Sequence, residues 1–191
     1  MIAWQSMEED GYEADLDRLF AANLETGEKY WLSEGWDYNV EDINWTADGE
    51  TIYFTSPYRG TTQVFNINLA SKAINQVSSG KFDFGPISLT AESIVSGVQS
   101  MSMALEICTI NPADGAMNMV TSVNGNIYDN IRMGNTEERY IRTKDNKDLQ
   151  MWIIYPPDFD SFQIIPHTSL LQGGSAGTGL ARVGATGGIL R

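Results

Sequence analysis

The residue of this sequence with the clearest chemical potential is Ser175, which lies in the stretch LQGGSAG at residues 171–177. The five residues from Gly173 onward fit the G-x-S-x-G pattern, in which a tight turn between a strand and a helix can expose a serine hydroxyl as a nucleophile. That chemistry also needs a histidine base, a carboxylate that orients the histidine, and backbone N–H groups that bind the oxyanion. The meaning of the pattern therefore depends on the partners that the rest of the chain supplies.

The partners that Ser175 needs are missing from the sequence around it. His167 is the only histidine and precedes Ser175 by eight residues, whereas this kind of site takes its serine, acid and histidine in that order along the chain. No Asp or Glu follows Asp160. We therefore predict no catalytic residue in this chain, and we interpret His167 as a surface or strand-end residue.

The composition excludes some classes of partner. The 191 residues include 12 Lys and Arg against 25 Asp and Glu, which gives a formal net charge of −13 at pH 7. Affinity for nucleic acid comes mostly from Lys and Arg, so no nucleic-acid partner is expected. No run of 18 apolar residues and no signal-peptide pattern occurs, so we expect no membrane segment in this chain, and the compartment stays unassigned.

Two further features have structural rather than chemical interpretations. Cys108 is the only cysteine, so no disulfide within the chain is expected, and the β-rich run around it predicts a buried thiol. The acidic stretch Met7–Asp17 predicts a lengthened loop with a solvated charged face, in which Glu8 and Glu9 have no ligand role. We predict no metal site and no cofactor.

Three segments of the chain read alike at a spacing of about 44 residues. They are Leu19–Gly27, Val64–Lys72 and Ile107–Gly115, and their asparagines Asn23, Asn68 and Asn111 align at spacings of 45 and 43 residues. The pairs that follow in the same register are Leu32-Ser33, Val77-Ser78 and Val120-Thr121. Each segment is therefore predicted to form two strands joined by a tight turn.

A second hairpin is predicted between these segments. Ile43–Ser56 contains the turn dipeptide Asp48-Gly49 and is echoed by Ile87–Ser96. Four short strands in each period, with almost no helical periodicity, are typical of the blades of a β-propeller. The predicted fold is therefore mainly β, with a partial blade, a complete blade over about 37–78 and a third over about 82–121.

Alternation within the strands predicts which side chains enter the core. Phe20, Phe65 and Cys108 occupy equivalent positions in the three repeats, so Cys108 is expected to take the inward place of a phenylalanine. The repeated aromatic motifs at 36–38 and 82–84 suggest either a ligand cage or packing between neighbouring blades, and packing explains the repetition better.

A different pattern begins after Thr121, where the period ends. Residues 138–157 read as one long hairpin, with a turn at Lys144–Lys147 and an apolar strand that ends at Pro156-Pro157. We therefore place a domain boundary between residues 133 and 134. Residues 1–133 then hold the blades, and residues 134–191 begin a second domain.

The order of these motifs resembles that of the prolyl oligopeptidase family of serine peptidases, in its dipeptidyl-peptidase and acylaminoacyl-peptidase branches. In that family the last propeller blade leads into a hairpin with a Tyr-Pro-Pro end, here Tyr155–Pro157, and Trp45–Phe54 resembles the family's Trp-Ser-Pro-Asp-Gly repeat. The resemblance covers residues 1 to about 160. It implies that residues 1–133 are the C-terminal blades of a propeller and that residues 134–191 are the truncated N-terminal portion of an α/β-hydrolase domain.

The resemblance also assigns a role to the glycine-rich tail. Gln172, Gly173 and Gly174 fall where the family has a Gly-Gly-Pro loop next to the oxyanion site, and Ser175 takes the place of the proline. The family's Ser, Asp and His triad follows later in the hydrolase domain. The resemblance thus implies a segment of a serine peptidase that hydrolyses short peptides behind a gating propeller, and that is inactive in this form. The composition change after Asp160 is the basis for a further hypothesis, a truncated or frame-shifted tail.

Two alternatives stay open beside the peptidase. A TolB-like propeller segment that acts as a protein-binding module would need only the blades. An independent esterase that uses Ser175 would need a base and an oxyanion hole, neither of which the sequence supplies. The partners expected are peptide substrates for the full-length protein, together with self-association of this chain through the open strand edges of an incomplete propeller.

Overall fold

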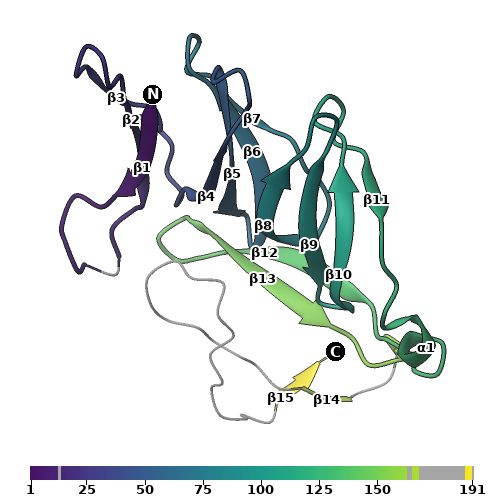
Figure 1. Cartoon of the computed structure of the whole chain (residues 1–191). Helices are drawn as coiled ribbons and strands as arrows, with labels where there is room; N and C mark the ends of the chain where they lie inside the picture. The colour runs from purple at the N-terminus through teal and green to yellow at the C-terminus, as the bar shows by residue number, and fades with distance from the viewer. Residues whose placement is uncertain (13, 163–164, 168–187, 191) are drawn as a thin grey trace. The chain divides into compact units, whose positions relative to one another are not determined.

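The computed structural model describes residues 1–12, 14–162, 165–167 and 188–190 (Figure 1). The chain divides into two compact units, Met1–Asn126 and Ile127–Arg191. This division falls a few residues before the boundary that the sequence predicts between residues 133 and 134. The assignment of the second part to a hydrolase domain stays a prediction.

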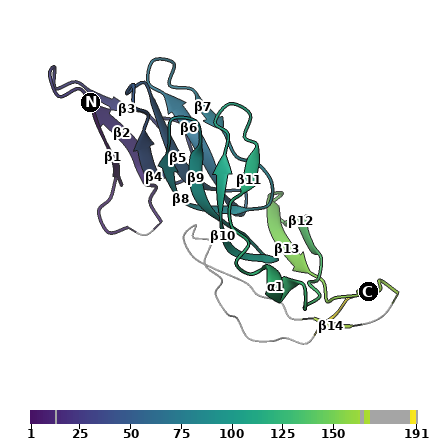
Figure 2. The same cartoon turned by 45° about the vertical axis from the view of Figure 1, so that its right-hand side comes forward.

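Three antiparallel sheets, which follow one another along the chain, make up the first unit. The first sheet contains β1 (Ile2–Ser6), β2 (Arg18–Ala22) and β3 (Lys29–Trp31). The second contains β4 (Glu41–Trp45), β5 (Thr51–Tyr58), β6 (Thr61–Asn68) and β7 (Ile74–Gln76). The third contains β8 (Asp83–Leu89), β9 (Ile94–Ser100), β10 (Met103–Ile110) and β11 (Met117–Met119). Strands that are consecutive in the chain are paired within each sheet, which confirms the mainly β fold with propeller-like blades (Figure 2).

The aligned asparagines build the same turn in all three sheets. The carbonyl of each accepts a bond from the residue four positions later, at Gly27, Lys72 and Gly115, and all three of these residues have positive φ. The side-chain oxygen of each asparagine also accepts a backbone N–H two residues on, at Glu25, Ala70 and Ala113. A short polar side chain that satisfies its own turn explains why asparagine recurs there.

A hydroxyl in each repeat completes the pairing of the last two strands. Ser33 accepts the N–H of Leu19 at 2.9 Å, and Ser78 accepts that of Val64 at 2.8 Å. Thr121 in the third repeat accepts the N–H of Ile107 at 2.8 Å. The sequence register between these positions is therefore confirmed at the level of single hydrogen bonds.

The core of the first unit lies between the sheets. One cluster joins the first and second sheets, and its buried members are Leu19, Ala21, Leu32, Val40, Ile52, Phe54, Phe65 and Ile67. The other joins the second and third sheets, and its buried members are Val64, Phe84, Ile87, Ile94, Val98, Cys108 and Ile110. Strands β5 and β6 of the second sheet thus contribute side chains to both clusters, as stacked blades require.

The predicted inward positions are confirmed in two repeats and differ in one. Phe65 and Cys108 are buried, as expected. In β2 the buried residues are Leu19 and Ala21, because the second sheet packs against that face. Phe20 lies on the opposite face, where its ring stacks between those of Trp4 and Trp31 at centroid distances of 5.8 and 6.1 Å.

Side chains from one sheet also hold the backbone of the sheet before it. The N–H of Asp17, beside β2, donates to Oδ1 of Asn39 at 3.0 Å, just before the second sheet begins. The N–H of Thr62 in β6 donates to Oδ1 of Asp83 in β8 at 2.8 Å. We call these two bonds the inter-sheet struts. They recur at the repeat spacing and fix the offset between neighbouring sheets.

The second unit contains a long hairpin. Strands β12 (Thr136–Arg142) and β13 (Asp148–Ile154) pair along their whole length, and Thr143 closes the turn by accepting the N–H of Lys147 at 3.0 Å. The predicted hairpin is therefore confirmed. The short strands β14 (Ile165–His167) and β15 (Gly188–Leu190) pair with each other, and the one-turn helix α1 (Gly125–Tyr128) spans the division between the units. Among the described residues, no helix is long and apolar enough to cross a membrane.

Candidate functional site

The residues that the sequence singled out in the tail are mostly outside the described part of the chain. Gln172, Gly173, Gly174 and Ser175 all lie there, so the oxyanion-loop assignment stays a prediction. His167 is the last residue of β14, and its backbone pairs with that of Gly188.

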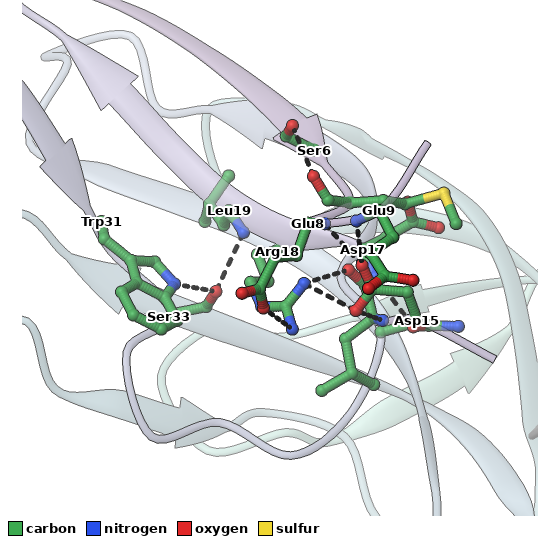
Figure 3. Close-up of polar contacts among 12 residues, drawn as sticks. Ser6, Glu8, Glu9, Asp15, Asp17, Arg18, Leu19, Trp31 and Ser33 are labelled. Atoms are coloured by element: carbon green, nitrogen blue, oxygen red, sulfur yellow. Dashed lines mark hydrogen bonds and ion pairs between the residues drawn. The ribbon is translucent and has the colours of Figure 1, made fainter. Parts of the chain in front are cut away.

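A polar network lies in the β1–β2 loop, for which the sequence analysis predicted a solvated acidic face (Figure 3). The carboxylate of Asp15 is its centre. It accepts backbone N–H bonds from Glu8, from Glu9 at 2.8 Å and from Leu16 at 2.8 Å. These bonds, led by the one from Glu9, together with the bond from Arg18, lower the pKa of Asp15 to about 2.

Arg18 at the start of β2 connects this loop to the first sheet. Its guanidinium bonds to Asp15 at 2.8 Å, to the carbonyl of Leu16 at 3.2 Å and to the exposed carboxylate of Glu8 at 3.2 Å (Figure 3). The Asp-x-x-Arg spacing was the sequence signal for the ion pair between Asp15 and Arg18, and the sequence analysis missed it. Each contact satisfies a backbone group or an ion pair, so the network ties Glu8, Glu9 and Leu16 to the start of β2.

The loop network is built to hold structure rather than to perform chemistry. Its members are carboxylates and one guanidinium, and the pKa of its central carboxylate, Asp15, is lowered. Throughout the described residues, no group of three or more His, Cys, Asp or Glu side chains is placed to hold a metal ion. The exposed carboxylates leave an acidic surface that attracts cations by charge alone.

The aromatic motif at 36–38 is a packing element. The ring of Trp36 meets that of Phe65 at 4.9 Å and stacks on Tyr58 at 6.0 Å. Its indole N–H donates to Ser56 Oγ at 3.3 Å. Filling both the face and the edge of Trp36 with neighbouring side chains supports the packing interpretation over a ligand cage.

A second polar cluster lies on the hairpin of the second unit. The hydroxyl of Tyr155 donates to Glu137 at 2.6 Å, and Arg139 donates to Glu137 at 2.8 Å and to the Tyr155 oxygen at 3.0 Å. The hydrogen bond to Glu137 raises the pKa of Tyr155 and also that of Arg139. Both groups therefore keep their protons, and the cluster ties Tyr155 to β12.

Solved structures with a similar fold include peptidases and a putative TolB. The AtxE2 isopeptidase matches 91% of this chain with a TM-score of 0.72 at 14% identity, and the match covers 27% of that chain. The acylaminoacyl peptidase of Pyrococcus horikoshii matches 81% with a TM-score of 0.66 at 16% identity, over 23% of its length. A putative TolB from Agrobacterium tumefaciens matches 62% with a TM-score of 0.51 at 10% identity, over 45% of its length. The class defined by the fold is therefore that of propeller-type sheets as they occur in such peptidases.

Sequence relatives narrow the class. Dipeptidyl-peptidase 5 of Porphyromonas gingivalis is 35% identical over 177 residues, which cover 93% of this chain and 26% of that protein. Its namesake in Porphyromonas endodontalis is 32% identical over the same span. The chain is thus similar over nearly its whole length to these peptidases, and it spans about a quarter of the length of the curated relatives that it matches. No protein-family model matches the chain.

Proposed function

We propose that this chain is a segment of a serine peptidase that hydrolyses short peptides, with the propeller controlling access to the site. The observation that carries the proposal is the match of nearly the whole chain to two proteins named dipeptidyl-peptidase 5. The meander sheets and the β12–β13 hairpin support it, since they follow each other in the order that the sequence resemblance implies.

We further propose that the 191-residue chain has no peptidase activity of its own. The triad order requires a histidine after the serine and an acid between them, and no acid follows Asp160. Removing members of such a triad typically costs on the order of 10⁴- to 10⁶-fold in rate. Ser175 therefore has the pattern of a nucleophile without the groups that would activate it.

The test compares the 191-residue chain with a version extended through a complete hydrolase domain. The extended protein should release a chromogenic group from dipeptide substrates and react covalently with a fluorophosphonate, and the short chain should do neither. Ser175→Ala distinguishes the remaining case, with Ser169→Ala as the matched control in the same tail. Probe labelling of the short chain that is lost only in Ser175→Ala would contradict the proposal and favour the independent esterase.

The TolB-like binding module is the second candidate, and the likeness of the sheets to the putative TolB of Agrobacterium tumefaciens favours it. A module of this kind needs no hydrolase domain. A folded, extended protein that hydrolyses no peptide and takes no fluorophosphonate would support this candidate against the peptidase.

We also propose that the isolated chain associates with itself through open strand edges. Among the described strands, β1 pairs with β2 alone, and no described strand lies along its other edge in the first sheet. Such edges recruit other chains, against which the charge of −13 acts only as a general repulsion. Sedimentation velocity at several concentrations is the measurement, and a monodisperse monomer throughout would contradict this part of the proposal.

A further inference from the structure

One position of the repeat carries a long polar side chain in all three copies. Arg18, Gln63 and Glu106 each directly precede the residue whose N–H is held by the serine or threonine of its repeat. The three side chains differ in charge. Arg18 and Gln63 donate to backbone carbonyls, whereas Glu106 accepts backbone N–H groups. In the second and third sheets, this position bonds to the segment that leaves the sheet.

In the second sheet, Gln63 bonds to the backbone carbonyls of the segment that leads to the third sheet. The side chain is buried, and its oxygen accepts the hydroxyl of Ser78 at 2.7 Å. Its nitrogen donates to the carbonyls of Gly80 at 3.2 Å and Phe82 at 2.8 Å. An amide suits this linker because it offers an acceptor for the serine and donors for the carbonyls.

In the third sheet, Glu106 holds the departing chain by its N–H groups. The side chain is 5% exposed, and it accepts the hydroxyl of Thr121 at 2.5 Å. It also accepts the backbone N–H of Val123 at 3.0 Å and of Asn124 at 2.9 Å, and the side-chain amide of Asn124 at 3.2 Å. Both oxygens are thus fully used, and a carboxylate suits a linker that presents only donors.

The segments that leave the second and the third sheet present opposite kinds of backbone group to this position. After Gln63 the carbonyls face the sheet and the chain continues to β8, whereas after Glu106 the N–H groups face the sheet and the chain enters α1. In the first sheet, Arg18 bonds instead to Asp15 in the acidic loop. The hydroxyl oxygen of Ser33 there accepts the indole N–H of Trp31. Glu106 therefore holds the stretch that immediately precedes the division between the two units.

We propose that Glu106 is a positioning residue that anchors the segment Thr121–Asn124 on the first unit, and so sets where the chain between the two units begins. The four bonds converge on this one buried carboxylate. When the anchor is lost, the segment Thr121–Asn124 is released from the third sheet, so the unpaired stretch that leads into α1 becomes longer. The third sheet keeps its own strand pairing. The proposal is independent of any peptidase activity.

Backbone amide exchange in the full chain tests the anchor. In Glu106→Gln, the new NH₂ group replaces one of the two carboxylate oxygens and cannot accept an N–H. Exchange at whichever of Val123 and Asn124 loses its acceptor should accelerate about 10- to 100-fold, the range expected for a lost charge-assisted bond. Amides of β9 and β10 should keep their rates. Glu92→Gln, which removes an exposed carboxylate from the β8–β9 turn, is the charge-matched control and should change neither set.

Two outcomes would overturn the anchor. Unchanged exchange at Val123 and Asn124 in Glu106→Gln would mean that the carboxylate does not hold them. Equal acceleration across β9 and β10 would mean that Glu106 supports the sheet as a whole. If Glu106→Gln does not fold, Glu106→Asp keeps the charge and withdraws the carboxylate by one methylene, and it should give the same local pattern.

A distance measurement separates an anchor from a merely local contact. Nitroxide labels at Glu92→Cys and Lys144→Cys place one probe on each unit, and the buried Cys108 stays unlabelled. The distribution of distances between the probes should broaden when Glu106→Gln is added. Identical distance distributions with and without the substitution would show that anchoring Thr121–Asn124 does not restrict the movement of one unit relative to the other.

Discussion

The turn between β10 and β11 comes so close to the second sheet that its glycine makes a direct test of the stacking. Gly115 has a φ of 72°, and a Cβ atom added there would overlap the backbone carbonyl of Val77. Gly27 occupies the same turn position in the first sheet with a φ of 74°, but a Cβ atom there would meet nothing within 4 Å. The two glycines therefore share a backbone constraint and differ in the space around them.

Alanine at the two positions should separate these effects. Gly27→Ala should lower the free energy of unfolding by about 1–2 kcal/mol, the cost of a left-handed φ for an L residue. Gly115→Ala adds the cost of pushing the turn away from the second sheet, about 1–3 kcal/mol, for a total of about 2–5 kcal/mol. Lys72, which has a φ of 54° at the same position in the second sheet, shows that the turn itself accepts a side chain.

Denaturant unfolding followed by tryptophan fluorescence measures both losses, because four of the five tryptophans lie in the first unit. Gly27→Ala is the matched control, since it carries the φ cost without the overlap. The midpoint and slope together give the free energy for each variant. Equal losses for Gly27→Ala and Gly115→Ala would refute the close approach of the β10–β11 turn to Val77.

Acid should weaken the first unit as the pH falls from about 4.5 to 2. The pKa values of Asp15 and Glu106 lie at about 2, below their ordinary values of 3.8 and 4.5, so their stabilisation is complete above the ordinary values and is lost toward the lowered ones. The unfolding midpoint across this range is the measurement, and a flat profile would contradict the networks. Cys108 is fully buried, and burial raises its pKa, so a charged maleimide should label it only in denaturant. Rapid labelling of the native chain would show the strand register to be wrong. Asn68→Ala should lower the free energy of unfolding by about 1 kcal/mol, because the N–H groups of Ala70 and Ser71 lose their acceptor. Unchanged stability in denaturant unfolding would show that the turn does not need its asparagine.

The hairpins and their register could be predicted because their chemistry is local. An asparagine such as Asn68 satisfies its own turn within three residues, so the sequence alone carries the signal. The structure extends the repeat to the first strand, because Trp4 pairs with Phe20 in the same stacked geometry as Phe54 with Phe65. Repetition turned three weak local patterns into one firm prediction.

The contacts that were missed depend on tertiary context. Alternation separates the two faces of β2, but it does not say that Leu19 rather than Phe20 is covered, because that depends on which side the next sheet occupies. Helix α1 is a single turn, too short to show a periodicity. The anchoring role of Glu106 can be noticed only when the three copies of the repeat are aligned. Even then, whether its side chain bonds N–H groups or carbonyls depends on how the following backbone is oriented.

The inter-sheet struts impose an order on folding. The N–H of Thr62 finds its acceptor in Asp83, 21 residues later, and the N–H of Asp17 finds its acceptor in Asn39, 22 residues later. While the chain is being synthesised, a sheet can pair its own strands, but the N–H of Asp17 or of Thr62 has no acceptor until Asn39 or Asp83 has emerged. The hydrogen bonds of each sheet are therefore complete only after the start of the following repeat has been synthesised. A ribosome stalled between two repeats would leave the most recently formed sheet as the least stable part of the nascent chain.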